Sequence, residues 1–269
     1  PEWLSARKGR ITGSVVAAIM GLNPYETPDD LLRNKLWSIF QGNEACRYGN
    51  ENEDNVQESL ELMFEKYMIG KFFAGKRVKS FRIENPGLII DKNTPFMAMS
   101  PDGILIIEYF DGSTRRVLLE YKCPHSKRFY KFNDEKFVVV DKKDADENEK
   151  VKHDVDDIYT SQITPYYDIV KRPIPKYYTP QLCYGMYVLN MQDAFFVSWV
   201  PAKGKTTQKM SANIYRTPKG TIQFVHIERK KKFEDRMIDK IEKFWHNRYV
   251  PCLAMKELGL LKEGEIQYL

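Results

Sequence analysis

The chain has 269 residues, of which 42% are hydrophobic, so it is long and apolar enough to bury a core, which excludes a disordered protein. Its formal net charge of +5, with acids and bases both abundant, permits a nucleic-acid partner without requiring one. The four cysteines lack CxxC spacing, and we find neither a membrane-length apolar run nor a signal peptide, so we expect an intracellular protein without a zinc site or disulfide framework.

The first predicted helix is short and buried, because Val15 to Met20 are small and apolar and Gly21 ends the run. Thr12 and Ser14 stand at its start, where free backbone N–H groups and the helix dipole favour an anion. Plain helix capping is the alternative interpretation. A second helix is expected to begin at Thr27, which is followed by a proline and two acids, and to serve as scaffold.

A longer helix is predicted over Asn50 to Met68 from an apolar stripe at helical spacing. At about 100° per residue, Glu53 is the acid of this helix that falls on the stripe, while the other acids fall on the opposite side. A core-facing acid at a helix start is either a capping or snorkelling side chain or a carboxylate that belongs to a site.

The centre of the sequence predicts a β-hairpin. Short apolar runs between Phe72 and Met99 are broken by turns and read as strands that lead into it. The hairpin itself consists of two alternating strands, roughly Ile104 to Tyr109 and Arg115 to Tyr121, joined at the Asp111-Gly112 turn.

Charged side chains cluster at one end of this hairpin. Glu120 and Lys122 share a face of the second strand because side chains alternate with period two, and pairing brings Asp102 close to both. Two adjacent carboxylates repel unless a cation joins them, and oxygen ligands favour Mg²⁺ or Mn²⁺. The alternative is a Glu-Lys cross-strand pair beside a turn aspartate.

The last third of the chain contains a charged stretch and then regular elements. Residues 131–175 read as a solvated insertion, because Asp141 to Asp157 is dense in charge and lacks apolar periodicity. A helix is predicted to start near Tyr178, and two strands and an amphipathic helix follow it: Phe195 to Val200, Ile222 to Ile227 and Lys230 to His246. We therefore expect an α/β fold with a central mixed sheet flanked by helices, in one domain over residues 1–269 with this insertion.

Four motifs together resemble the PD-(D/E)xK nuclease superfamily, and more closely its branch of phage lambda exonuclease and YqaJ-like viral recombinases. They are Arg7-Lys8-Gly9-Arg10-Ile11-Thr12-Gly13-Ser14, Gly49-x-x-x-Glu53, Ser100-Pro101-Asp102-Gly103 followed by Leu119-Glu120-x-Lys122-Cys123-Pro124, and Tyr178-x-x-Gln181. The resemblance covers nearly the whole chain and implies a restriction-endonuclease-like core. The sequence departs from the family pattern in the insertion and at Cys183, where the family has a second glutamine.

The resemblance assigns roles residue by residue. It implies two Mg²⁺ or Mn²⁺ ions held by Asp102, Glu120, the carbonyl of Tyr121, and Glu53. Lys122 would orient the nucleophile and Gln181 would support it, although a buried glutamine could be purely structural. The matching 5′-phosphate pocket consists of Arg7, Ser14, Ser100 and Arg128.

The activity that the resemblance implies is a metal-dependent 5′-to-3′ exonuclease on linear duplex DNA ends, which leaves 3′ single-stranded tails for recombination or replication. Partners implied in the same way are DNA ends, a homotrimer and a single-strand annealing protein. Two alternatives stay open: a related viral alkaline-type nuclease with endonuclease or RNase activity, and a DNA-end-binding subunit of a recombination complex.

Overall fold

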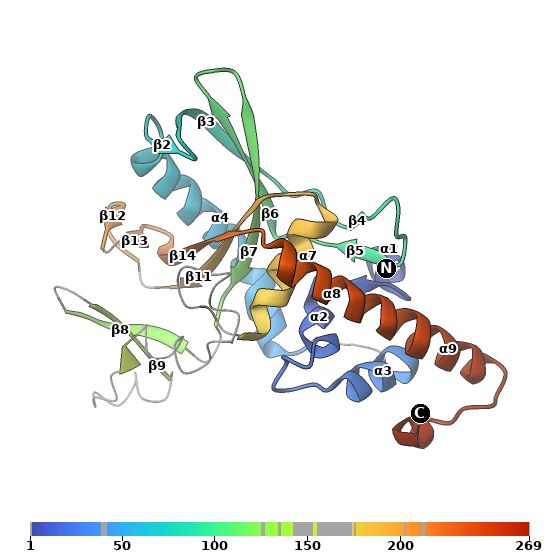
Figure 1. Cartoon of the computed structure of the whole chain (residues 1–269). Helices are drawn as coiled ribbons and strands as arrows, with labels where there is room; N and C mark the ends of the chain where they lie inside the picture. The colour runs from blue at the N-terminus through green and yellow to red at the C-terminus, as the bar shows by residue number, and fades with distance from the viewer. Residues whose placement is uncertain are drawn as a thin grey trace.

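The computed structural model describes residues 2–38, 42–124, 127–133, 136–141, 153–154, 174, 176–201, 203–210 and 213–268. Its centre is an eight-stranded mixed sheet with the strand order β12-β13-β14-β11-β7-β6-β3-β2 (Figure 1). The strands of this sheet are β2 (Phe72–Phe73), β3 (Lys76–Glu84), β6 (Gly103–Tyr109), β7 (Thr114–Lys122), β11 (Asp193–Val200), β12 (Gln208–Lys209), β13 (Ile214–Thr217) and β14 (Gly220–Glu228).

Two smaller three-stranded sheets accompany it, in the orders β1-β5-β4 and β10-β9-β8. Their strands are β1 (Ile11–Thr12), β4 (Ile89–Ile90), β5 (Met97–Met99), β8 (Lys127–Asn133), β9 (Lys136–Asp141) and β10 (His153–Asp154). The helices are α1 (Glu2–Arg7), α2 (Gly13–Ile19), α3 (Pro28–Trp37), α4 (Glu44–Tyr67), η1 (Lys176–Tyr178), α7 (Thr179–Val188), α8 (Lys231–Phe244), η2 (Trp245–Tyr249), α9 (Val250–Glu257) and η3 (Glu263–Tyr268). The predicted α/β fold with a mixed central sheet is confirmed.

The predicted hairpin is present as β6 and β7, paired antiparallel with Gly103 opposite Leu119. The turn lies at the predicted Asp111-Gly112 position, and Gly112 adopts a left-handed φ of 81° that a glycine tolerates without strain. On the other side of β7 lies β11, and this pair is parallel, which makes the sheet mixed.

Helices cover both faces of the central sheet. Helix α4 packs on one face, where its Val56 and Leu60 meet the odd-numbered β7 residues such as Leu119. Helices α2, α7 and α8 pack on the other face, the one that Leu118 faces (Figure 1). The period-two alternation of β7 is thereby confirmed, and its even-numbered residues point toward α7.

Helix α4 begins at Glu44, earlier than the predicted Asn50. The side chain of Asn43 caps it by accepting a hydrogen bond of 2.8 Å from the Cys46 backbone N–H. Glu53 therefore lies well inside the helix, and the interpretation of Glu53 as a helix cap is wrong. Asn43 is a favoured helix-capping residue, and it lies upstream of the apolar stripe from which the helix was predicted.

The charged region after Pro124 contains strands that the sequence analysis missed. Strands β8 and β9 form an antiparallel hairpin, and β10 pairs with β9. The apolar run Phe137-Val138-Val139-Val140 was the available signal, and the charged residues around it obscured it. Residues 142–152 and 155–173, which make up most of the predicted insertion, lie outside the described residues.

The C-terminal helix is longer than predicted. Beyond α8 the chain continues through the π-helical turn η2 into α9, although Pro251 follows. Pro251 has no N–H to donate to the preceding turn, and it lies directly beyond the π-helical turn η2, an irregularity at which a helix can continue past a proline. Among the described residues, none of the helices combines the length and hydrophobicity needed to cross a bilayer.

We expect Gly185→Ala to destabilise the protein by ~1–3 kcal/mol, because an added methyl group would overpack the interface between α7 and β7. A Cβ at Gly185 would lie 2.6 Å from Leu118 Cδ2 and 3.0 Å from Met99 Cε. Gly49→Ala in α4 is the matched control, since nothing lies within 4 Å of its added Cβ. Denaturant unfolding measures both, and equal stabilities would contradict the close approach of α7.

Candidate active site at the end of strand β7

The centre of the candidate site is Glu120, which is 1% exposed. Its Oε1 accepts hydrogen bonds from the Lys122 ammonium on the same strand and from the Gln181 side-chain amide on α7. Residues two apart on a strand share a face, so β7 presents the acid and the base together, and α7 covers them with Gln181. The structure thus brings together three of the predicted site residues.

Asp102 approaches this cluster from the turn before β6. Its Oδ2 accepts a hydrogen bond of 2.5 Å from the Tyr121 backbone N–H, which fixes the carboxylate against the end of β7. Burial raises the pKa of Asp102, and the Lys122 charge and the Tyr121 hydrogen bond offset part of that shift. The predicted proximity of Asp102 to Glu120 and Lys122 is confirmed.

Glu53 lies on α4, the helix that covers the opposite face of the sheet. It is exposed rather than core-facing as predicted, because the buried stripe of α4 starts only at Val56, one turn further along. Partial burial of its carboxyl group, and then repulsion from Asp102, still raise the pKa of Glu53. Lys122 acts on it in the other direction, so Glu53 senses the charges of the cluster.

The electrostatics of the carboxylates fit a divalent cation. Burial, followed by repulsion from Asp102, raises the pKa of Glu120, and the Oε2 atom of Glu120 is buried without a hydrogen-bond partner. A cation would relieve the repulsion and give that oxygen a partner. Within the described ranges, no three His, Cys, Asp or Glu side chains gather closely enough to define a metal-binding group by themselves.

Lys122 stays protonated in this setting. Burial lowers the pKa of Lys122, but the charges of Glu120 and Asp102 outweigh burial and raise it. Its ammonium also lies 5.1 Å from the centre of the Tyr178 ring, which favours the charged form. Lys122 therefore lies beside the two carboxylates as a positive charge and a hydrogen-bond donor.

The neighbouring cysteine is not poised as a nucleophile. Burial, and then the negative charge of Glu53, raise the pKa of Cys123 to about 12. A thiol with such a pKa is almost entirely protonated near neutral pH, and a thiolate is the reactive form. Cys123 therefore lacks the thiolate that a covalent mechanism would need.

A second polar group lies at the start of the chain. A guanidinium nitrogen of Arg7 donates to Thr12 Oγ1 at 3.3 Å, and Thr12 Oγ1 lies 3.4 Å from Ser14 Oγ. Burial lowers the pKa of Arg7, so its positive charge is partly desolvated. The predicted residues Arg7 and Ser14 are thereby placed side by side through Thr12.

Sheet register brings together the ends of the two strands that precede Ser14 and Ser100. Strands β1 and β5 are parallel with Thr12 opposite Ala98, so the chain leaves both strands at the same end, with Ser14 two residues beyond Thr12 and Ser100 two residues beyond Ala98. Tyr184 of α7 ties the two strands together, since its hydroxyl donates to the Ile11 carbonyl at 2.7 Å and accepts from the Ala98 N–H at 3.0 Å. The sequence analysis missed this tyrosine.

The N-terminal group and the carboxylate cluster adjoin each other at Gly13. A Cβ on Gly13 would lie 2.9 Å from Met99 Sδ and 3.1 Å from Gln181 Cγ. Gln181, which donates to Glu120, therefore packs directly against the residue before Ser14. A larger residue at this position would have to displace the Met99 or Gln181 side chain.

Arg128, the fourth predicted residue of the phosphate pocket, lies in β8 opposite Val140 of β9. Its side chain lies outside the described residues.

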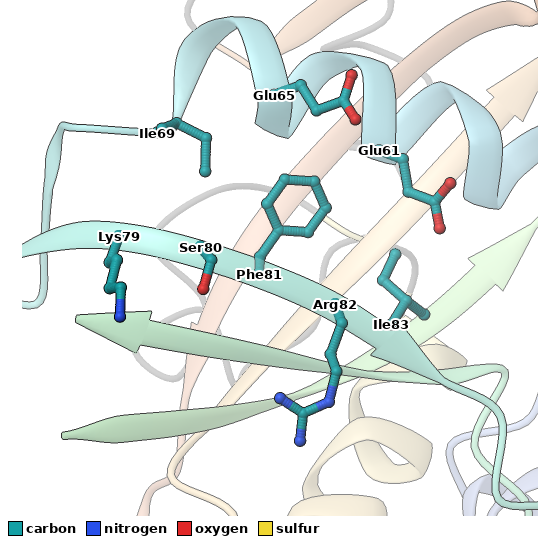
Figure 2. Close-up of a pocket in the computed structure, with 8 residues that line it drawn as sticks. All are labelled: Glu61, Glu65, Ile69, Lys79, Ser80, Phe81, Arg82 and Ile83. Atoms are coloured by element: carbon teal, nitrogen blue, oxygen red, sulfur yellow. The ribbon is translucent and has the colours of Figure 1, made fainter. Parts of the chain in front are cut away.

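An open groove of about 580 Å³ lies elsewhere, between α4 and β3. Figure 2 shows Glu61 and Glu65 on the helix, with the Phe81 ring between helix and strand and Arg82 on the strand. None of the predicted site residues lines this groove, so it is separate from the carboxylate cluster.

A protein-family model described as the YqaJ-like viral recombinase domain matches residues 2–192. No curated protein sequence matches the chain. Among solved structures, LHK-Exo in complex with dAMP aligns with a TM-score of 0.51 and 19% identity, over 99% of this chain and 94% of that chain. A second structure of LHK-Exo, an alkaline exonuclease from Laribacter hongkongensis, has a TM-score of 0.49, 20% identity and the same coverage of 99% and 94%. The SOX–RNA complex of KSHV aligns with a TM-score of 0.48 and 10% identity, over 96% of this chain and 73% of that chain.

Proposed function

Because the chain belongs to the YqaJ-like viral recombinase family, we propose that it degrades linear duplex DNA from its 5′ ends with the help of Mg²⁺ or Mn²⁺ and leaves 3′ single-stranded tails. Family membership makes the chain a nuclease. The substrate, polarity and metal are the parts that we propose. LHK-Exo, which shares this fold, was solved with the deoxyribonucleotide dAMP, and this supports DNA as the substrate.

The observation that carries the proposal is the arrangement around Glu120. A buried carboxylate whose Oε1 is held by Lys122 and Gln181, and whose Oε2 has no partner, is preorganised to bind a cation. A structural Glu-Lys pair would not need a second carboxylate, Asp102, beside it, because the repulsion would cost stability.

The carboxylates of Asp102 and Glu120 and the carbonyl of Tyr121 would hold one ion, and Glu53 would serve a second ion or its water. Such ions supply Lewis-acid activation of the scissile phosphate and of the attacking water. The fixed ammonium of Lys122 orients that water and balances charge on the phosphate, and Gln181 keeps Glu120 in place. The 3′-oxygen of the sugar is the leaving group.

Selection of the 5′ end would rest on Arg7, Ser14, Ser100 and Arg128. A guanidinium binds phosphate through two hydrogen bonds, and the hydroxyls add directed donors. Because Gln181 contacts both Glu120 and the Gly13 position, a phosphate held beside Ser14 would lie close to the cleaved bond. This proximity supports removal of nucleotides from the end.

We also propose that the chain is one nuclease domain over residues 1–269 with an insertion near 131–175, that it forms a homotrimer, that it acts with an annealing protein, and that it is intracellular. Sedimentation with and without duplex DNA tests the oligomer, and a monomer under both conditions would contradict the trimer.

Comparing linear with covalently closed circular duplex tests whether cleavage needs a free end, and release of a 5′ label tests its polarity. An exonuclease should degrade only the linear form and release nucleotides from the 5′-labelled strand. Cleavage of the circle, or of RNA at a similar rate, would instead favour an alkaline-type nuclease that cuts internally. Binding of ends without any turnover would favour a DNA-end-binding subunit.

We expect Glu53→Gln to slow turnover while the melting temperature stays within experimental error of the wild type. Glu53 is exposed and does not cap α4, so its loss leaves the fold intact, whereas its charge acts on Asp102. Glu51→Gln, another exposed acid of the same helix, is the matched control. Normal turnover for Glu53→Gln would remove Glu53 from the site, and a loss of ~1 kcal/mol of stability would indicate a structural role.

A further inference from the structure

The face of the central sheet that carries Glu120 is only partly covered by helices. On β7, Leu118 packs into the core with α7 and α8, whereas Arg116, the next residue along the same face, is exposed. Arg116 lies opposite Ile106 of β6, and Arg82 of β3 lies opposite Ile106 from the other side. Figure 2 shows the Arg82 side chain pointing away from α4, as this register requires. The uncovered part of this face therefore begins with a row of two exposed arginines.

Three more exposed side chains lie on the same face at the turn end of the β6–β7 hairpin. Val78 and Tyr109 pack toward α4, so their neighbours Arg77 and Phe110 turn to the opposite face, where the Arg77 guanidinium lies 4.7 Å from the centre of the Phe110 ring. Phe72 of β2 pairs with Arg77 across the strands and lies beside it. Phe72 and Phe110 are 77% and 60% exposed, although phenylalanine is usually buried.

We call these five residues the open strip: Phe72, Arg77, Arg82, Phe110 and Arg116. The strip leads from the covered part of the sheet to the end of the hairpin, which extends beyond α7 and α8 (Figure 1).

The charges of the open strip favour an anionic partner. The acids beside it are already paired with cations, in the ion pairs Arg82–Glu84, Arg82–Glu108 and Lys76–Asp111. Within the described part of the chain, neither Arg77 nor Arg116 forms an ion pair with a carboxylate. These two guanidinium groups are therefore available to phosphate groups, which they bind through directed hydrogen bonds.

Protection of the sheet edge does not explain these side chains. Past Val78, β3 is an edge strand among the described residues, and charged side chains on an edge prevent pairing with other chains. Exposed phenylalanines have the opposite effect, because they favour association. Aromatic rings beside cations are instead the arrangement that binds single-stranded nucleic acid, since unpaired bases stack on the rings while the cations bind the phosphates. Bases within a duplex already stack on one another.

We propose that the open strip binds a single strand of DNA that leaves the candidate active site. Phe72 and Phe110 stack with unpaired bases, and Arg77 and Arg116 bind the phosphates between them. The proposal rests on the proposed function, because the 3′ tail that remains after 5′-to-3′ digestion is this strand. The seven residues of β6 span about 23 Å, so a tail of about seven nucleotides reaches from the carboxylate cluster to the hairpin turn.

The test compares DNA duplexes with a blunt end and with 3′ tails of about 4 and about 12 nucleotides, which are shorter and longer than that distance. Fluorescence anisotropy measures their affinity, with Ca²⁺ in place of Mg²⁺. The wild type should bind the long tail at least about fivefold more tightly than the blunt end, the gain expected from one stacked base, and the short tail should give little of it. Phe72→Ala combined with Phe110→Ala should abolish the gain and leave the affinity for the blunt end unchanged.

The two arginines test the phosphate contacts of the strip. Arg77→Gln and Arg116→Gln should each reduce the gain from the long tail, and the reduction should shrink as the salt concentration rises, because phosphate contacts release counterions. Leu258→Ala is the matched control, since Leu258 is 72% exposed but lies at the end of α9, outside the strip. This variant should keep the full gain, and thermal melts of all variants report on folding.

The outcomes separate this proposal from the proposed function. Equal wild-type affinity for blunt and long-tailed ends, or a gain that the double variant retains, would overturn the single-strand surface, while digestion of linear duplex reports independently on the nuclease. Equal weakening of all ends by the double variant would also overturn it, because a contact with the duplex explains that result. A double variant that changes only the sedimentation of the protein would identify the strip as a contact between copies of the chain. Digestion from 3′ ends with an intact gain would overturn the proposed polarity and leave the binding surface standing.

Discussion

Replacing Asp102 with asparagine, or Glu120 with glutamine, should slow turnover at least about 100-fold, which corresponds to ~2.7 kcal/mol of transition-state stabilisation. Both changes preserve the size of the side chain and an oxygen that accepts hydrogen bonds. They remove the negative charge that a divalent cation requires. DNA binding should persist, because most of its free energy comes from phosphate contacts outside this cluster.

Metal-dependent melting provides an independent readout of the same variants. Mg²⁺ or Mn²⁺ should raise the melting temperature of the wild type and should not raise that of either variant, since a ligand stabilises only the state that binds it. Glu108→Gln is the matched control, because Glu108 lies on the neighbouring strand β6 and is held by Arg82 and Ser80. Turnover of the wild type at its full rate in excess chelator would contradict the metal assignment.

The sequence sufficed to predict the hairpin of β6 and β7 because the features that define it are local. The turn at Gly112 and the alternation along β7 are local properties, and together they fix both the register and the face on which Glu120 and Lys122 lie. Once the register is fixed, the position of Asp102 next to Tyr121 follows without knowledge of the rest of the fold. Local pattern and global packing agree here.

Other contacts of the site depend on distant parts of the chain and left no local pattern. The Tyr184 hydroxyl joins β1 to β5 across more than eighty residues of sequence, and Lys35 of α3 donates to the Arg10 carbonyl just before β1. Neither contact has a periodicity to detect. The exposure of Glu53 was also missed, because helical periodicity gives the direction of a side chain but not where the packed interface ends.

We expect a linear duplex with a 5′-phosphate to be cut faster than the same duplex with a 5′-hydroxyl, and Arg7→Ala to shrink that ratio. Burial lowers the pKa of Arg7, which means that its charge is held partly away from water at a cost that a bound phosphate would offset. The hydroxyls of Thr12 and Ser14 lie in line with it and can donate to the same anion. Arg128→Ala should act in the same direction as Arg7→Ala.

Single-turnover cleavage of the two substrates measures the ratio for each variant. The loss should fall on the phosphorylated substrate, since a contact that positions the terminal phosphate sets the geometry of the adjacent bond and thereby its rate. Arg10→Ala is the control, because the Arg10 guanidinium is directed at the carbonyls of Pro95 and Ala6, and it should leave the ratio unchanged. Equal wild-type rates on the two ends, or cutting from 3′ termini, would contradict the phosphate pocket. Either result would also contradict the 5′-to-3′ polarity, because that polarity depends on which end the pocket binds.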